Sequence, residues 1–171
     1  VGSHTGIFSW AALQLGAKFV HGIDVEERTI NRCMELFLKE EINPSSYTFQ
    51  AENITNFLER IDAKSFNTVF CFGVLYYMAE PLNLLKLMAR AAKETILIDT
   101  FTASYSAVQG KDAPEIYPHL TSQILNLPLM ISCPTQSKKK DYSLPESFNR
   151  KGRSLSLISL PTKAMLELWF E

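Results

Sequence analysis

The stretch GSHTGIFSWAALQLGAKFVHGID, residues 2–24, decides the fold. It starts with a turn that contains two glycines, and a helical pattern over residues 8–15 follows directly. Residues 18–24 then form an apolar strand pattern that stops at Asp24. A glycine turn in front of a helix brings bare backbone and unpaired helix N–H groups close to a ligand. The stretch therefore predicts a ligand site at this turn, with a tight turn that binds nothing as the alternative.

The spacing between the turn and the next acidic residue indicates the kind of ligand. Asp24 lies 18 residues after Gly6, at the end of a predicted strand. A carboxylate in that place can accept two hydrogen bonds from ribose hydroxyls, as in dinucleotide-binding folds. The dinucleotide fingerprint itself fails, because its second and third glycines would fall on His4 and Ile7. NAD therefore fits this turn poorly.

Apolar runs and helical patterns continue to alternate up to residue 100. We expect helices over residues 26–40, 55–61 and from Pro81 onward, and strands over residues 47–51, 68–72 and 95–99. Strands and helices in alternation imply parallel strands with right-handed crossovers. The predicted fold class is α/β, a Rossmann-like, doubly wound and mostly parallel sheet.

The pattern changes near Phe101, which divides the chain into three predicted regions. Residues 1–100 form the ligand-binding core. Residues 101–153 contain five prolines and no steady period, apart from a turn or two of helix near residues 121–127, so we expect a long irregular lid or substrate-side insertion. Residues 154–171 return to a strand and a helix of the same domain.

Two candidate site residues follow the strand at residues 47–51. Glu52 and Asn53 come directly after its last residue. A carboxylate at the carboxyl end of a strand can accept a hydrogen bond from an adenine amino group. A solvated glutamate at a strand end is the alternative for Glu52.

A tyrosine pair follows the strand at residues 68–72. Gly73 permits a sharp exit from this strand, and Tyr76 and Tyr77 come next. Two consecutive tyrosines at such a rim are costly to leave exposed and carry polar tips. Contact with a ligand is one interpretation of each tyrosine, and core packing is the other.

Three segments resemble motifs of class I S-adenosylmethionine-dependent methyltransferases. Residues 2–24 look like their first motif and second strand, and residues 66–85, FNTVFCFGVLYYMAEPLNLL, look like their fourth motif. The group that contains the tRNA wobble-uridine carboxymethyltransferases is most similar, because it often reads GVLYH followed by a proline. LPTKAMLELWF, residues 160–170, resembles a late helix of that group.

The resemblance implies S-adenosylmethionine as the cofactor and gives roles to particular residues. The glycine turn would cradle the methionine part, Asp24 the ribose, and Glu52 with Asn53 the adenine. The strand end at Cys71–Gly73 would pass beneath the sulfonium. The implied cofactor-binding set is Gly2, Ser3, His4, Gly6, Asp24, Val25, Glu52, Asn53, Phe72 and Gly73.

The chain departs from the family pattern at two positions. His4 stands where the family usually has its middle glycine; histidine tolerates a positive φ, so the turn can survive, although the ring could crowd the cofactor. Tyr77 replaces the histidine of GVLYH, which puts the acid–base role of that histidine in doubt. Basic residues that would bind the extra carboxylate of a carboxylated cofactor cannot be identified, so ordinary S-adenosylmethionine is favoured.

Methyl transfer mainly requires that the protein align the nucleophile with the methyl group and exclude water. A base helps where the acceptor atom carries a proton. The candidate catalytic residues are Tyr76, Tyr77 and His119. His21 lies inside a strand pattern and is better explained as a structural histidine. No metal site is expected.

Composition sets the expectations for partners and location. The net charge of -1 gives no global pull toward nucleic acid or membrane. A small molecule is the expected acceptor, and tRNA is the alternative, although a solvated loop explains the Lys138–Lys140 run better. Three cysteines without a CxxC motif fit a reducing cytoplasm. No apolar run approaches the ~20 residues of a membrane span.

The two ends of the sequence carry an expectation of their own. The chain starts one residue before the glycine turn and stops in the late helix. We expect the sheet to lack its first strand and its last strands, in an excerpt of a longer gene product that is marginal alone. A non-catalytic methyltransferase-like binding module is the first rival function, and an NAD-dependent oxidoreductase is the second.

Overall fold

The computed structural model describes residues 1–104, 121–137, 149–150 and 153–170. The chain divides into two compact units. Unit 1 contains Val1–Phe72 and Lys86–Ile98, and unit 2 contains Gly73–Leu85 and Asp99–Glu171. The predicted lid residue His119 and the Lys138–Lys140 run lie outside the described residues.

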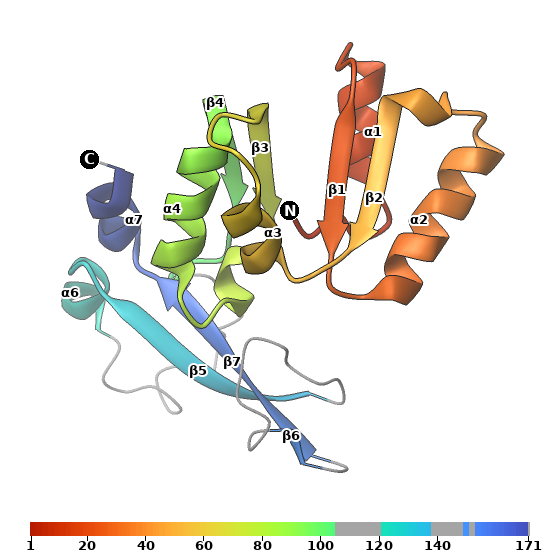
Figure 1. The fold of residues 1–171 in the computed structure, drawn as a ribbon. Coiled ribbons are helices and arrows are strands. Elements are labelled where there is room, and N and C mark those ends of the chain that lie inside the picture. Colours follow the sequence, from red (N-terminus) through yellow and green to blue (C-terminus); the bar gives the residue numbers. More distant parts are fainter. Residues whose placement is uncertain (105–120, 138–148, 151–152, 171) are drawn as a thin grey trace. The chain divides into compact units, whose positions relative to one another are not determined.

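Unit 1 holds the alternating helices and strands that the sequence predicts (Figure 1). Its elements are α1 (Ile7–Gln14), β1 (Val20–Asp24), α2 (Glu27–Lys39), η1 (Pro44–Ser46), β2 (Tyr47–Ala51), α3 (Ile54–Arg60), β3 (Phe66–Phe72), α4 (Pro81–Ala91) from Lys86 onward and β4 (Ala92–Asp99) up to Ile98. Each predicted helix and strand of the first hundred residues is present, with bounds that shift by a few residues.

The strands of unit 1 form two separate pairs. β1 and β2 are parallel, with a register that runs from Val20 opposite Tyr47 to Asp24 opposite Ala51. β3 pairs with β4. The predicted α/β, Rossmann-like class is confirmed. No described strand lies between the β1–β2 pair and the β3–β4 pair.

The core of unit 1 beside the glycine turn is built by one face of α2. Ile30, Cys33 and Phe37 recur at helical spacing and are all buried. They form a cluster with Phe49 of β2, whose ring centroid lies 4.7 Å from that of Phe37 in an edge-on arrangement. This packing fixes α2 against the strand pair that ends at Asp24.

Unit 2 contains short helices and an antiparallel sheet. Its elements are η2 (Leu75–Tyr77), the start of α4, α6 (Ser122–Leu125), β5 (Met130–Ser137), β6 (Asn149–Arg150), β7 (Arg153–Pro161) and α7 (Lys163–Phe170). The strand order is β5-β7-β6, and Met130 pairs with Pro161 at one end of the β5–β7 ladder. Tyr76, Ala103 and Leu160 form its buried cluster.

Strand β5 lies inside the segment that we expected to be irregular. The strand contains Pro134, which pairs with Leu157 of β7. A proline removes one backbone donor and is tolerated mainly on edge strands, and β5 is an edge in the described part of this sheet. The proline that made the segment look irregular is thus accommodated by its edge position.

Thr162 joins the end of β7 to the start of α7. Its side chain is fully buried, and its hydroxyl donates a hydrogen bond to the carbonyl of Leu127 at 2.6 Å. The same oxygen accepts from the backbone N–H groups of Leu129 at 3.1 Å and Met165 at 3.2 Å. One hydroxyl therefore satisfies three backbone groups and caps the helix.

Replacing this hydroxyl by a methyl group should destabilise unit 2. Thr162→Val leaves partly buried backbone groups without this partner, so we expect a loss of about 1–3 kcal/mol in the free energy of unfolding. Urea denaturation measures it. Thr48→Val makes the same chemical change at an exposed position of β2 and should alter stability little. Equal stabilities for the two variants would contradict this role of Thr162.

Candidate functional site

The glycine turn is built from residues with left-handed backbone. Gly2, His4 and Gly6 have φ angles of 64°, 44° and 78°. The N–H of Gly6 donates to the carbonyl of Ser3 at 2.8 Å, and α1 begins at the next residue. The turn thus does tolerate a histidine at position 4, as the sequence predicted, because histidine is among the residues that adopt positive φ.

Gly6 is needed for space as well as for conformation. A Cβ atom at this position would lie 2.9 Å from Cε2 of Phe37 and closer still to the sulfur of Cys33. Both side chains belong to the buried face of α2. The turn therefore packs directly against that helix, and a side chain would push them apart.

Asp24 ties three segments of chain together at the end of β1. Its Oδ2 accepts a hydrogen bond from the N–H of His4 at 2.9 Å, and its Oδ1 accepts one from the N–H of Glu26 at 3.1 Å. Its backbone carbonyl accepts from the N–H of Glu52 at 2.9 Å. The glycine turn, the start of α2 and the end of β2 are thus held at one carboxylate-bearing residue.

Glu52 has a basic partner that sequence reasoning missed. Its Oε2 lies 2.5 Å from a guanidinium nitrogen of Arg60 and also accepts from the side-chain amide of Gln50 at 2.8 Å. The guanidinium lies 5.6 Å from the ring centroid of Phe57. Arg60 ends α3, eight residues after Glu52, and no pairing pattern in the sequence marks that separation. The predicted adenine acceptor is therefore a paired carboxylate.

Asn53 has a clear structural role in the start of α3. Its Oδ1 accepts hydrogen bonds from the N–H groups of Thr55 at 2.9 Å and Asn56 at 3.3 Å. This is the arrangement of an N-cap, which asparagine favours. The contact with an adenine stays a prediction for Asn53.

Phe72 ends β3 close to the start of α1. Its ring lies 4.7 Å from that of Phe8 in an edge-on arrangement and 5.2 Å from that of Phe70 in a stacked one. Phe8 is only two residues beyond Gly6. Unit 1 thus brings the glycine turn, the Asp24–Glu52 pair and the end of β3 into one region.

Three further sequence candidates, Gly73, Tyr76 and Tyr77, belong to unit 2. Gly73 has φ 70°, and its N–H donates to the carbonyl of Asp99 at 2.9 Å. The ring of Tyr76 is buried, 4.4 Å from Tyr77 and 4.7 Å from Phe101. Tyr77 keeps 48% of its surface exposed. Tyr76 is therefore a core residue of unit 2, whereas Tyr77 is accessible from solvent.

His21 is a structural histidine in this fold. Its ring lies 4.9 Å from Phe57 and 6.0 Å from Phe66, and burial lowers its pKa. A neutral imidazole among phenyl rings fits the structural interpretation that its strand position predicted.

The described part of the chain has neither a metal-binding cluster nor a membrane-spanning helix. Among the described residues no three His, Cys, Asp or Glu side chains gather in a way that could hold a metal ion. No helix in the described ranges is long and apolar enough to cross a membrane.

Sequence comparison places the chain among methyltransferases. The model of a family described as Methyltransferase domain matches residues 1–148. The tRNA U34 carboxymethyltransferase of Campylobacter hominis is 26% identical over an alignment of 155 positions that covers 84% of this chain and 50% of that protein. The chain therefore spans about half the length of this curated relative. The resemblance seen in the sequence motifs is confirmed.

Solved structures share the fold at low sequence identity. The N-terminal domain of EvdMO1 with SAH bound has a TM-score of 0.58 and 17% identity, over 98% of this chain and 60% of that one. Magnesium protoporphyrin IX methyltransferase from Synechocystis PCC 6803 with bound SAH has a TM-score of 0.56 and 15% identity, over 95% of this chain and 72% of that one.

A methyl group at Gly6 should disrupt the turn by two effects. Gly6→Ala combines a left-handed backbone with overpacking against Cys33 and Phe37, so we expect a loss of about 2–5 kcal/mol in the free energy of unfolding. Gly16→Ala is the matched control, because Gly16 also has positive φ but no atom lies within 4 Å of the place that a Cβ would take. It should lose only ~1–2 kcal/mol. Equal losses in urea denaturation would show that the close approach is unimportant.

Proposed function

We propose, because this chain belongs to the methyltransferase domain family, that unit 1 binds S-adenosylmethionine and that the protein is a methyltransferase. The observation that carries the proposal is the set of contacts at Asp24. This residue holds the glycine turn through His4 and the end of β2 through Glu52. The residues predicted to contact the ribose, the methionine part and the adenine thus lie together at the carboxyl ends of β1 and β2.

Asp24 has the acceptor capacity that a ribose requires. A carboxylate offers about four lone-pair sites, and the described contacts of Asp24 use one on each oxygen. The backbone bonds also fix the orientation of the carboxylate before a ligand arrives. We therefore propose that the two ribose hydroxyls donate hydrogen bonds to the Asp24 carboxylate, with the Val25 backbone beside them.

Glu52 would accept a hydrogen bond from the adenine amino group, and Asn53 would flank the adenine. All contacts of the Glu52 carboxylate with described residues use Oε2, so Oε1 is the oxygen that we assign to the adenine amino group. Arg60 fixes the orientation of the carboxylate through this ion pair. Asn53 contributes its backbone, because its side-chain oxygen caps α3.

The turn and the start of α1 would hold the methionine part. Gly2, Ser3 and Gly6 form this turn, and the first N–H groups of α1 have no partners within the helix. S-Adenosylmethionine supplies a methyl group on a sulfonium with a good leaving group. The chain then has to align the acceptor and exclude water, for which Phe72 provides an apolar wall.

The candidates for contact with the acceptor are Tyr77, His119 and Tyr76. Tyr77 is the strongest of them because half of its surface is accessible, whereas Tyr76 packs against Leu160 and Ala103. Tyr76 would then position the loop that Gly73 starts. His119, which lies outside the described residues, stays a candidate base from the sequence alone.

We expect a small molecule as the acceptor. The net charge of -1 gives no general attraction to RNA. The name of the Campylobacter hominis relative supports tRNA as the second candidate. Two described cysteines, Cys33 and Cys71, are buried, which suits the cytoplasm that we propose as the location.

Removing the charge of Asp24 should weaken the cofactor site without unfolding it. Asp24→Asn keeps the shape of the side chain but loses charge-assisted hydrogen bonds worth about 1.5–3 kcal/mol. We expect the dissociation constant of S-adenosylhomocysteine to rise about 10- to 150-fold in calorimetry. Asp62→Asn, an exposed change of the same kind, should leave the affinity unchanged.

The same titration separates the rival functions. Equal affinity of the Asp24 and Asp62 variants would contradict the proposed ribose contact. Binding of NAD in place of S-adenosylhomocysteine would favour the oxidoreductase. A folded chain that binds neither ligand would favour the non-catalytic binding module.

A further inference from the structure

The ion pair between Glu52 and Arg60 lies at the carboxyl end of β2, where we propose that the adenine is bound. A guanidinium nitrogen of Arg60 lies 2.5 Å from Oε2 of Glu52. The arginine side chain is 57% exposed, so the pair is partly open to water. An ion pair of this kind contributes little to stability. Its main consequence is therefore the orientation that it gives to the Glu52 carboxylate.

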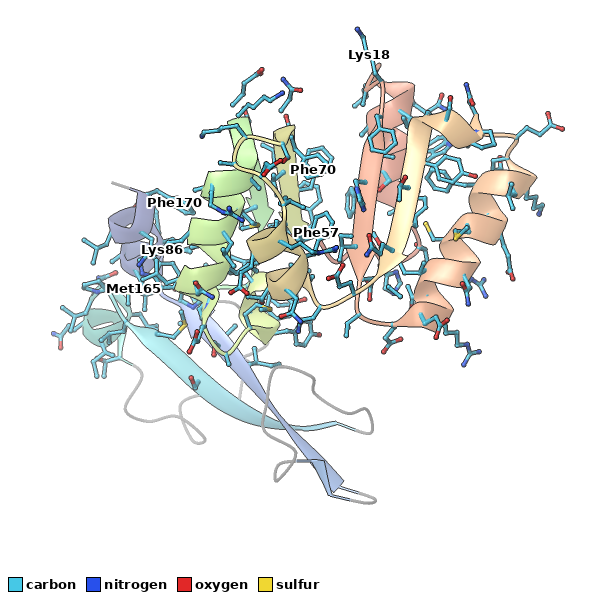
Figure 2. All side chains as sticks on the ribbon, in the orientation of Figure 1. Lys18, Phe57, Phe70, Lys86, Met165 and Phe170 are labelled. Carbon is cyan, nitrogen blue, oxygen red and sulfur yellow. The ribbon has the colours of Figure 1, made fainter. Side chains whose placement is uncertain are left out.

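Arg60 is itself held in place by an aromatic ring. Its guanidinium carbon lies 5.6 Å from the centroid of the Phe57 ring, which is a cation–π geometry. Phe57 is labelled on α3 in Figure 2, and its side chain is buried. The two residues are three positions apart on this helix and therefore lie on the same face of it. The buried ring thus restricts where the exposed guanidinium can lie.

The carboxylate of Glu52 is anchored through one of its two oxygens. Oε2 accepts hydrogen bonds from Arg60 at 2.5 Å and from the side-chain amide of Gln50 at 2.8 Å. The backbone N–H of Glu52 donates to the carbonyl of Asp24 at 2.9 Å, which fixes the start of the side chain as well. All hydrogen bonds of this carboxylate with described residues use Oε2. Oε1 is therefore the oxygen that remains for a ligand.

A carboxylate in this position can distinguish purines by the group at carbon 6. Adenine carries an amino group there, which donates a hydrogen bond. A 6-oxo purine such as hypoxanthine carries a carbonyl oxygen there, and both this oxygen and an ionised carboxylate are acceptors only. Two acceptors that face each other stay unpaired, which is costly in a desolvated site. A site built around one hydrogen bond therefore rejects the analogue that lacks it.

The rejection of a 6-oxo purine depends on how freely the Glu52 carboxylate can turn. Hypoxanthine carries an N–H donor at nitrogen 1, next to its carbonyl group. A carboxylate that rotates freely could turn to this N–H and regain a hydrogen bond. A carboxylate anchored by Arg60 and Gln50 has to break existing bonds before it can do so. The selectivity therefore depends on the anchor as well as on the carboxylate.

We propose that Arg60 is a positioning residue, which holds Glu52 so that the site selects a 6-amino purine over a 6-oxo purine. In this role Arg60 acts through Oε2 of Glu52 and makes no contact with the purine. The inference rests on the proposed binding of S-adenosylmethionine by unit 1. It adds the residue that sets the purine selectivity of that site.

Two ligands that differ in the group at carbon 6 of the purine test the proposal. S-Adenosylhomocysteine carries the amino group, and S-inosylhomocysteine carries the oxygen. Calorimetry gives the selectivity ratio, which is the dissociation constant of the inosyl ligand divided by that of the adenosyl ligand. We expect a ratio of about 10 to 100 for the unaltered chain, because one hydrogen bond is lost and one acceptor stays unpaired.

Removing the guanidinium should lower this ratio. Arg60→Met keeps an unbranched apolar side chain beside Phe57 but frees the Glu52 carboxylate, so we expect the ratio to fall about five- to tenfold. Arg60→Lys keeps a positive charge for Oε2 and should retain a higher ratio than Arg60→Met. Arg32→Met removes an exposed arginine of α2 and should leave the ratio unchanged.

A change at Glu52 shows whether Arg60 acts through that residue. In Glu52→Gln the amide oxygen has to face the Arg60 donor, so the amide N–H group takes the place of Oε1 and donates to the purine. This variant should therefore prefer S-inosylhomocysteine, with a ratio below one. Adding Arg60→Met to it lets the amide turn, and the ratio should rise toward one. Loss of the same arginine thus changes the ratio in opposite directions in the two backgrounds.

The outcomes separate this inference from the proposed function. If the chain binds S-adenosylhomocysteine and Arg60→Met weakens both ligands equally or neither of them, Arg60 has only a structural role and the proposed cofactor stands. A change of the ratio in the same direction in both backgrounds would also refute the positioning role. A folded chain that binds neither ligand would refute both the proposed cofactor and this inference.

Discussion

The carboxylate of Asp24 is the point at which the turn, a helix and two strands meet. The two carboxylate oxygens accept hydrogen bonds from the backbone N–H groups of His4 and Glu26. The backbone carbonyl of Asp24 accepts one from the N–H of Glu52. Hydrogen bonds to an ionised acceptor are stronger than those between neutral groups. The bond from His4 ties the glycine turn to the end of β1.

The packing of α2 adds a second constraint on the same turn. Gly6 lies so close to Cys33 and Phe37 that no side chain fits there. The turn is thus held by a hydrogen bond at His4 and by van der Waals contact at Gly6. A ligand that binds to such a turn meets backbone groups that are already in place, which lowers the entropic cost of binding.

The sequence was sufficient for the parts of the structure that depend on local spacing. The alternation of apolar runs predicted the helices and strands of unit 1, and the apolar run that stops at Asp24 predicted the end of β1. The Glu52–Arg60 pair could not be predicted, because it depends on the angle at which α3 leaves β2. Asn53 was interpreted as a ligand contact, although its side chain serves as a helix cap. Strand β5 was missed because Pro134 interrupts its pattern and only its edge position makes the proline acceptable.

The amide spectrum of the chain tests the central claim most directly. Titration of the ¹⁵N-labelled protein with S-adenosylhomocysteine should shift the signals of His4, Gly6, Glu26 and Glu52 together, with one saturation curve. The amides of His4, Glu26 and Glu52 are hydrogen-bonded to Asp24, and Gly6 belongs to the same turn as His4, so a ligand on the Asp24 carboxylate has to change their environment. Shifts confined to other parts of the chain, with these four signals unmoved, would contradict the account.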